Sequence, residues 1–486
     1  MPTTNLRNST HVTGTAPDNT MTIDTPNAVP AIVADKWIRA IKEKRSDKEK
    51  KDKEVETAQV KGNVKISLET QNVADDTELT ISLLDAGDNS ELTTVKVKLK
   101  KNKGDTENIE IKNDWYNKEL IVSVTKDNNS NLGETYTGTK KLKISCCEHA
   151  IVRGDEGDLI KEINIRLAGF GEFGCPLPQS LFDERTERAV KQFQRDYMKV
   201  NPTGIICKDT LEALDQFMAD YNIPLDSCEC SCVNKGQAVK NAVDDSNETN
   251  NCNGFGDGSN KTQYLNKYTR NKKDKEGKDI FKSDGKTPET EKVVEYTTKN
   301  KGELFYAYEY PGMHRSLMWG FRALLFYLEK DATSFAFWQI SSGYRCRNNS
   351  EYRSGKTTNH MGKAIDIQFS HNGTNITGKN QANVDLITEL RDAIYKKLGV
   401  EPKSGWGAPQ NRLAFEPIGL KPGQTSSWLH MDVRTFQRIN PSYLADEFFA
   451  NTIELINGQN LITLLDTIDD GVRKDIETCN SKFEKK

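Results

Sequence analysis

The sequence predicts a multidomain chain that combines an all-β sandwich, a small three-helix domain and an α+β domain with an antiparallel sheet. Its 486 residues suggest about three domains. Residues 55–145 alternate apolar and polar side chains, as half-buried strands do, whereas residues 154–220 space their apolar side chains as amphipathic helices do. The formal net charge of −3 argues against a nucleic-acid-binding protein, and no run of about 18 apolar residues predicts a membrane span.

Residues 1–54 are predicted to form a disordered and charged tail. Residues 1–35 are rich in Thr, Asn, Pro and Ser, and the segment KEKRSDKEKKDKE at 42–54 is almost wholly charged. The first residues lack the basic and then apolar regions of a secretory signal peptide. We therefore expect a protein that is secreted without a visible signal peptide.

Residues 55–147 are predicted to form an immunoglobulin-like β-domain. Segments such as VKISLET, TELTISLLD and TVKVKLK have period two, and turn-forming clusters such as DAGDNS separate them. No catalytic pattern is present there, which favours a spacer or docking module.

Residues 148–225 are predicted to form three short helices. Helical spacing predicts two apolar stripes, one formed by Ala189, Val190, Phe193 and Tyr197 and the other by Leu211, Leu214 and Met218. The segments FDERTERAVKQFQ and TGIICKDTLEAL resemble the small three-helix peptidoglycan-binding domain, so the resemblance implies peptidoglycan as a partner.

Residues 226–300 are predicted to form a Cys-containing linker. Four sulfurs lie close together in sequence, in SCECSC and NNCNG: Cys228, Cys230, Cys232 and Cys252. The C-x-C spacing differs from the usual pairs of a structural zinc site. Disulfides, a structural metal site and free thiols all remain open.

Residues 301–447 are predicted to form the zinc peptidase domain. They contain three motifs with candidate catalytic or metal-binding residues: SSGYRC, TTNHMGKAIDIQFS and SSWLHMDVRTF. The second is predicted to place His360 in a loop before a strand that carries Asp366, and the third is a predicted strand that carries His430. Two imidazoles and one carboxylate are the ligands of many catalytic zinc ions, since they leave the fourth position open.

In this order, the three motifs resemble the zinc D-Ala-D-Ala carboxypeptidase and endopeptidase family, whose fold includes phage endolysins and the hedgehog signalling domain. The resemblance implies that Zn²⁺ is held by His360, Asp366 and His430. It also implies that Arg345 binds a substrate carboxylate or the developing oxyanion.

The general base is not identified by the motifs, because Ser427 stands where many family members have an acid. Asp432 is the first candidate, since it shares a strand face with His430. Glu416 is the second. The alternative role for Asp432 is to orient a metal ligand.

Together these patterns predict a zinc-dependent peptidase that cuts the peptide stems or crosslinks of bacterial peptidoglycan. Delivery by a contractile (type VI) secretion system or as a phage-type lysin is expected, with action in the periplasm or on the cell wall. Secretion-spike proteins and an immunity protein are further expected partners. The alternatives are a non-catalytic, metal-containing wall-binding protein and a structural protein of a secretion apparatus. Residues 448–486 are predicted to form a helical tail.

Overall fold

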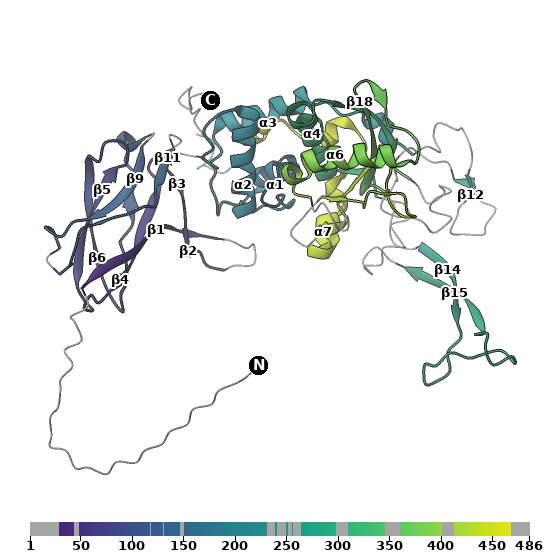
Figure 1. Ribbon diagram of the computed structural model, residues 1–486, viewed down its shortest axis with the longest axis horizontal. Helices are drawn as coiled ribbons and strands as arrows, with labels where there is room; N and C mark the ends of the chain where they lie inside the picture. The colour runs from purple at the N-terminus through teal and green to yellow at the C-terminus, as the bar shows by residue number, and fades with distance from the viewer. Residues whose placement is uncertain are drawn as a thin grey trace, which may run out of the picture. The chain divides into compact units, whose positions relative to one another are not determined.

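The structure, a computed structural model (Figure 1), describes residues 29–42, 48–116, 118–129, 131–145, 150–230, 239–240, 249–250, 255, 264–297, 310–345, 360–400 and 413–467. The chain divides into two compact units. One contains Met1–Lys36, Lys65–Glu107 and Ile121–Lys141, and the other contains Trp37–Val64, Asn108–Leu120 and Leu142–Lys486.

The N-terminal third of the described chain is built from short strands in two sheets. One sheet has the order β2-β1-β4-β7 with β8 beside β4, and the other has the order β3-β11-β9-β5-β6 with β10 beside β9. The bounds are β1 Ala31–Ile41, β2 Lys51–Glu54, β3 Thr57–Gln59, β4 Asn63–Gln71, β5 Glu78–Asp85, β6 Glu91–Lys98, β7 Lys103–Asp105, β8 Ile109–Glu110, β9 Glu119–Val124, β10 Tyr136–Thr137 and β11 Leu142–Ser145, with a short 3-10 helix at Asn113–Trp115. The predicted antiparallel strands are confirmed, although β3 and β11 pair in parallel. The immunoglobulin-like topology stays a prediction.

The prediction of a structureless tail over residues 1–54 is wrong for its second half. β1 is an eleven-residue strand, in which Trp37 and Ile41 are buried, and β2 pairs with it in antiparallel register. Polar residues dominate the preceding segment, but Ile32, Trp37, Ile38 and Ile41 supply enough apolar area for a strand. Residues 1–28 lie outside the described residues.

Three helices follow: α1 Asp158–Arg166, α2 Glu184–Phe193 and α3 Lys208–Asp220. The Asp183 carboxylate caps α2, since it accepts from the Arg185 and Thr186 N–H groups. The predicted stripe of α2 is buried, whereas α3 buries Phe217 rather than the neighbouring Met218, which was part of the predicted stripe. A π-helical turn at Gln194–Met198 continues α2, and a 3-10 turn η3 at Leu225–Cys228 ends this region.

The C-terminal part is an α+β arrangement around an antiparallel sheet of order β17-β18-β21-β20, with β19 beside β18. The strands are β17 Phe335–Ser342, β18 Ala364–His371, β19 Thr374–Asn375, β20 Ala414–Phe415 and β21 Leu429–Asp432, and a small ladder joins β16 Met313–His314 to β22 Phe449–Ala450. The helices are α4 Arg315–Asp331, α6 Gln381–Leu398 and α7 Arg434–Ile439, followed by 3-10 turns at Pro441–Leu444 and Asp446–Phe448. Helix α4 contacts both β17 and α6.

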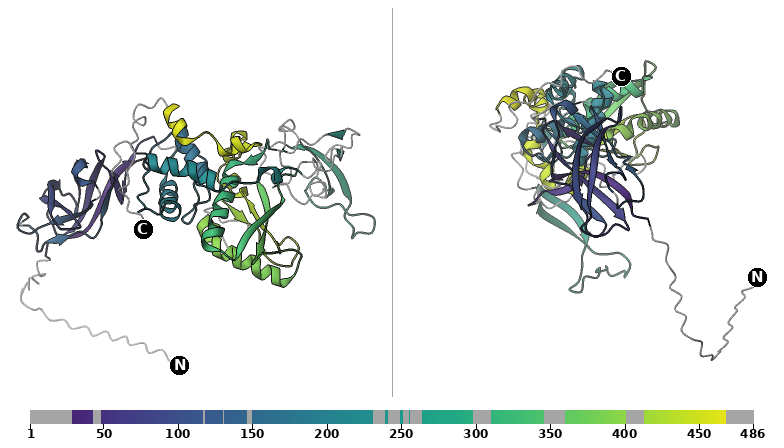
Figure 2. Two further views of the ribbon diagram at one scale, coloured as in Figure 1. Left: turned by 90° about the horizontal axis from the view of Figure 1, so that it is seen from above. Right: turned by 90° about the vertical axis from the view of Figure 1, so that its left-hand side faces the viewer.

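One continuous hydrophobic core joins the three-helix region to the C-terminal part. Its members run from Ile151 to Leu465, and the buried helix α4 contributes Leu317, Phe321 and Tyr327 among others. The predicted C-terminal tail is helical at α8 Ile453–Asn457 and α9 Leu461–Thr467, and α9 contacts α1 and α3 (Figure 2). The tail is therefore part of the core as far as Leu465.

The predicted linker at 226–300 contains regular structure. Strands β14 Tyr264–Asn271 and β15 Thr290–Thr297 form an antiparallel hairpin, and β12 Val239–Lys240 pairs with β13 Thr249–Asn250. Ion pairs such as Arg270–Glu291 at 2.8 Å cross the hairpin.

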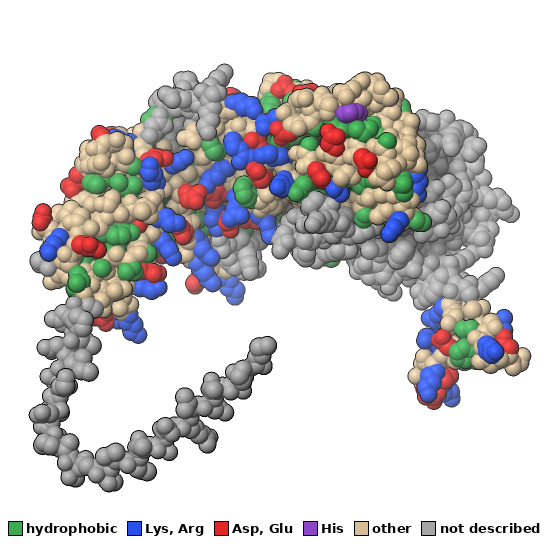
Figure 3. All heavy atoms as spheres, viewed as in Figure 1, with side chains coloured by type: hydrophobic (Ala, Val, Ile, Leu, Met, Phe, Trp, Pro, Cys, Tyr) green, Lys and Arg blue, Asp and Glu red, His purple; other side chains and the backbone are tan. Residues whose placement is uncertain are grey.

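Acidic and basic side chains are mixed on the face of the described residues seen in Figure 3. Within the described chain, no helix is both long enough and apolar enough to cross a membrane.

Candidate metal centre

The three predicted metal ligands lie together in the structure. Asp366 of β18 and His430 of β21 are directly opposite each other in the antiparallel register, and His360 begins the turn at residues 360–363 that leads into β18. One ligand atom of each residue lies within 4.8 Å of the other two, and all three side chains are buried. The site thus forms because period-two alternation places Asp366 and His430 on the same face of neighbouring strands.

Each imidazole turns one nitrogen toward Asp366 and bonds the other nitrogen to a protein acceptor. His430 places Nδ1 2.7 Å from Asp366 Oδ1 and Nε2 2.9 Å from Asp432 Oδ2. His360 places Nε2 3.5 Å from Asp366 Oδ2 and Nδ1 3.0 Å from the Gly343 carbonyl oxygen. Metal-binding histidines are usually held this way, with the outer N–H on a carboxylate or carbonyl and the inner lone pair free for the ion.

The electrostatics of the cluster fit a bound cation. Burial opposes charge on Asp366, but His360 and His430 outweigh it and hold the pKa of this carboxyl far below its usual range. Burial also opposes charge on His430, yet the Asp366 and Asp432 carboxylates raise the pKa of His430 to about 10. The site therefore holds ionised carboxylates beside a position that favours positive charge.

Arg345 lies at the same cluster, three residues after the end of β17. Its guanidinium Nη2 is 3.4 Å from Asp366 Oδ2, and its backbone N–H donates to the His360 carbonyl oxygen at 2.8 Å. The side chain is partly exposed. An Arg in this place can pair with an anionic group of a ligand that approaches the cluster.

The first candidate for the general base, Asp432, occupies the outer side of His430. It is fully buried, accepts from the Arg434 backbone N–H at 2.9 Å, and pairs with the Arg434 guanidinium. Because its contact is with Nε2, opposite the nitrogen that faces Asp366, its position suits the orienting role better than the role of a base.

The second candidate, Glu416, follows β20 and is half-buried. Its Oε1 is 3.8 Å from His430 Nε2 and 3.5 Å from Arg434 Nη2, so it also lies on the outer side of that ring. Ser427, which stands where many members of the resembled peptidase family have an acidic residue, is buried.

Two residues that the sequence analysis did not assign take part in the site. Arg434 forms an ion pair with Asp432. The H-x-D-x-R pattern in HMDVR is the sequence signal that could have predicted this contact. Gly343 supplies the carbonyl that accepts from His360, and its signal is the Gly of SSGYRC.

The cysteine segment packs against this site. Cys228 is a buried free thiol, and burial raises its pKa to about 12. Cys230 is buried in the same core, whereas Cys232 and Cys252 lie outside the described residues. The Cys228 carbonyl oxygen accepts from the Tyr344 N–H at 2.5 Å, so this segment supports the loop between Gly343 and Arg345.

Comparison with known proteins identifies one region. A family model described as a putative peptidoglycan-binding domain matches residues 156–214, which contain α1, α2 and most of α3. No curated protein and no solved structure matches the chain. The match supports association with the bacterial cell wall and peptidoglycan as a partner.

Proposed function

We propose that the protein is a zinc-dependent peptidase that hydrolyses peptide stems or crosslinks of bacterial peptidoglycan. The observation that carries the proposal is the buried His360–Asp366–His430 cluster, in which both imidazoles are fixed with one nitrogen toward Asp366. The peptidoglycan-binding domain packs in one core with this cluster, which supports a wall polymer as the substrate.

The donor set suits Zn²⁺. Two imidazole nitrogens and one carboxylate oxygen are a usual set for catalytic zinc, and the bonds from Gly343 and Asp432 to the outer ring nitrogens select the tautomers that the ion requires. When bound, Zn²⁺ supplies Lewis acidity that polarises a carbonyl group and makes water a stronger acid.

Side chains of the protein bind the substrate and position the groups of the site. Arg345 pairs with a substrate carboxylate, which positions the scissile amide at the cluster, or with the oxyanion that develops on the amide carbonyl. Asp432 keeps the ring of His430 in place, and Arg434 keeps Asp432 ionised and oriented. Glu416 is partly open to solvent but lies on the same outer side of this ring as Asp432, so we assign the role of proton acceptor to neither of them.

The test is incubation of the purified full-length protein with peptidoglycan sacculi, with mass spectrometry of the released muropeptides. We expect release that stops with a chelator and returns with added Zn²⁺. His360→Ala should abolish release and zinc binding, whereas His371→Ala, a histidine at the end of β18, should change neither. Full release by the chelated protein would refute the proposal.

We also propose an antibacterial role, with delivery to the periplasm of a competing cell. The support is the combination of a wall-binding domain with a candidate wall hydrolase site. Expression directed to the periplasm should lyse cells, and expression of the His360→Ala variant there should be harmless.

A non-catalytic wall-binding protein is the second candidate. The observations that favour it are Ser427 in place of an acid and the contact of Asp432 with the outer nitrogen of His430. Stoichiometric zinc binding without muropeptide release would select it.

A further inference from the structure

The sheet that carries the candidate metal centre has one apolar face and one polar face. Directly opposite residues of an antiparallel pair lie on the same face, so Ser342, Asp366 and His430 form one row across β17, β18 and β21. The apolar face packs against α4, where the ring centroids of Phe321 and Phe337 lie 5.4 Å apart. The candidate metal ligands of the strands therefore lie on the face of the sheet opposite α4.

A pair of amide side chains continues this polar face beside the metal centre. Gln368 lies two residues after Asp366 on β18 and on the same face, which places it roughly 7 Å farther along the strand. Gln339 of β17 is directly opposite Gln368, and its Nε2 donates to Gln368 Oε1 at 2.6 Å. Gln339 is exposed and Gln368 is half-buried, so a ligand in solvent can reach both amides.

The amide pair presents one acceptor and one donor to a ligand. Its internal bond uses Gln339 Nε2 and Gln368 Oε1, whereas Gln339 Oε1 and Gln368 Nε2 bond to no residue that the structure describes. A peptide group offers the complementary N–H donor and C=O acceptor. The chemistry of the pair thus fits the backbone of a peptide.

The positions along β17 indicate how long such a peptide must be. Arg345 follows the end of β17, whereas Gln339 precedes Ser342, so Arg345 and the amide pair lie on opposite sides of the row that contains Asp366. An extended chain advances about 3.3–3.6 Å per residue. A ligand whose carboxylate pairs with Arg345 therefore reaches the amides only if it continues for about two residues past the metal centre.

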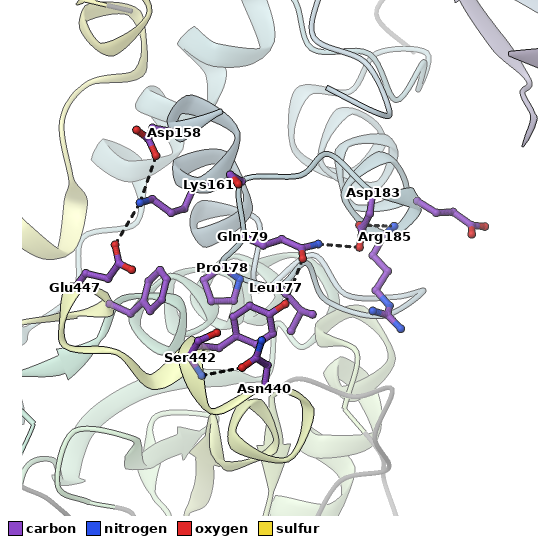
Figure 4. A pocket seen from close by; sticks show the side chains of 14 residues that line it. Asp158, Lys161, Leu177, Pro178, Gln179, Asp183, Arg185, Asn440, Ser442 and Glu447 are labelled. Carbon is purple, nitrogen blue, oxygen red and sulfur yellow. Dashed lines mark hydrogen bonds and ion pairs between the residues drawn. The ribbon is translucent and has the colours of Figure 1, made fainter. Parts of the chain in front are cut away.

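The cavity of about 740 Å³ in Figure 4 offers a less suitable path for a peptide stem. Four carboxylates and two cations are among its lining residues: Asp158, Asp183, Glu184, Glu447, Lys161 and Arg185. This balance disfavours an acidic stem, and the lining includes no residue of β17, β18 or β21. In contrast, the amide pair is uncharged and shares a sheet face with Asp366.

We propose that Gln339 and Gln368 bind a peptide group about two residues from the scissile amide, so that the metal centre acts on an extended or crosslinked stem peptide rather than on a free dipeptide. This inference rests on the proposed function, because it takes the stem peptide as the substrate of the metal centre. It assigns substrate selection to two side chains that are not metal ligands.

The test compares kcat/KM of the zinc-loaded full-length protein for a crosslinked muropeptide dimer and for D-Ala-D-Ala. The parent protein should cleave the dimer at least about tenfold more efficiently. Gln339→Ala should lower kcat/KM for the dimer about three- to tenfold, mainly through KM, and should leave the dipeptide reaction and the zinc affinity unchanged. Gln368→Leu should act in the same direction. The matched control is Gln381→Ala, which removes an exposed amide at the start of α6.

Equal losses on both substrates in Gln339→Ala would overturn the subsite, since the amide would then act through the metal centre. Equal efficiency of the parent protein on both substrates would overturn it as well. A thermal unfolding curve checks that each variant is folded, which we expect for Gln339→Ala because this side chain is exposed.

The two proposals fail separately. Chelator-sensitive cleavage of the dimer at the same kcat/KM in the parent protein and in Gln339→Ala would overturn the subsite and keep the hydrolase. If the parent protein cleaves neither substrate, isothermal titration with the dimer distinguishes the remaining outcomes. Weaker dimer binding in Gln339→Ala would then keep the subsite and overturn the hydrolase, whereas equal binding or none would overturn both.

Discussion

The two histidines of the candidate metal centre differ in the nitrogen that faces Asp366. His360 uses Nε2, and its Nδ1 is bonded to a backbone carbonyl, whereas His430 uses Nδ1, and its Nε2 is bonded to the Asp432 carboxylate. A carboxylate partner raises the basicity of its imidazole more than a carbonyl does. Asp432 should therefore influence the metal affinity more strongly than any backbone contact.

Replacing Asp432 with Asn is expected to lower the zinc affinity about 10- to 100-fold, because an amide supports the His430 ring less well than a carboxylate. Competition with a chromophoric chelator measures this affinity directly. Asp385→Asn, on the exposed face of α6, is the control and should leave the affinity unchanged. An unchanged affinity in Asp432→Asn would mean that Asp432 does not act through His430.

His314 lies outside the metal centre and gives the fold a pH dependence. It caps α4 by accepting from the Ser316 N–H, its Nε2 donates to the Tyr443 carbonyl, and burial lowers its pKa to about 4. The pKa of His in an unfolded chain is about 6.5, so the unfolded state takes up a proton that the folded state excludes. This contribution to stability is complete above about pH 6.5 and is lost as the pH falls toward 4.

The loss corresponds to about 3 kcal/mol of unfolding free energy between those limits. His314→Gln keeps a donor and an acceptor without the titration, so its unfolding free energy should fall less between pH 7 and pH 4 than that of the parent protein. Urea unfolding at both pH values measures the difference, with His371→Gln as the control. Parallel losses in His314→Gln and the parent protein would contradict the prediction.

At the scale of elements, the 3-10 turn at Leu225–Cys228 supports the end of β17. A Cβ atom on Gly343 would lie 2.3 Å from the Cys228 Cα atom and 2.4 Å from its carbonyl oxygen, which are backbone atoms that cannot turn away. Only a glycine allows the turn to approach so closely while the Gly343 carbonyl accepts from His360.

Gly343→Ala is therefore expected to displace this loop, to lower the zinc affinity and to destabilise the fold by roughly 1–3 kcal/mol. The measurements are chelator competition and urea unfolding. Gly87→Ala is the matched control, since a Cβ there meets only the flexible Asp85 side chain at 3.2 Å. Equal zinc affinity in both variants would show that the turn does not position His360.

The sequence predicted local features of these elements better than the contacts between distant ones. Period two placed Asp366 and His430 on strand faces, and helical spacing placed Val190 and Leu211 in a core, because both depend on neighbours in sequence. The ring nitrogen that His430 turns toward Asp366, and the packing of Cys228 on Gly343, depend on residues more than 60 and 100 positions apart respectively. The β1 strand was missed because its apolar residues follow a long polar segment.

At the scale of the whole molecule, helix α4 joins the peptidoglycan-binding domain to the candidate metal centre. Phe326 of α4 is buried in the core, and its ring centroid lies 6.0 Å from that of Phe217 and 5.6 Å from that of Tyr221. The Tyr327 hydroxyl contacts Gln192 and Asp196, at 2.7 and 2.9 Å. The Arg322 guanidinium donates to the Met218 and Tyr221 carbonyl oxygens at the end of α3.

A fragment of residues 148–230 is consequently expected not to fold alone, although a family model covers its helices. Without α4 and α9, the apolar faces of α1 and α3 would be exposed to water, at a cost of about 25 cal/mol for each Å². Circular dichroism during heating should show no cooperative transition for this fragment, whereas a fragment of residues 148–486 should unfold in a single one. A stable fragment of residues 148–230 would show that the shared core arose by docking of an independent domain.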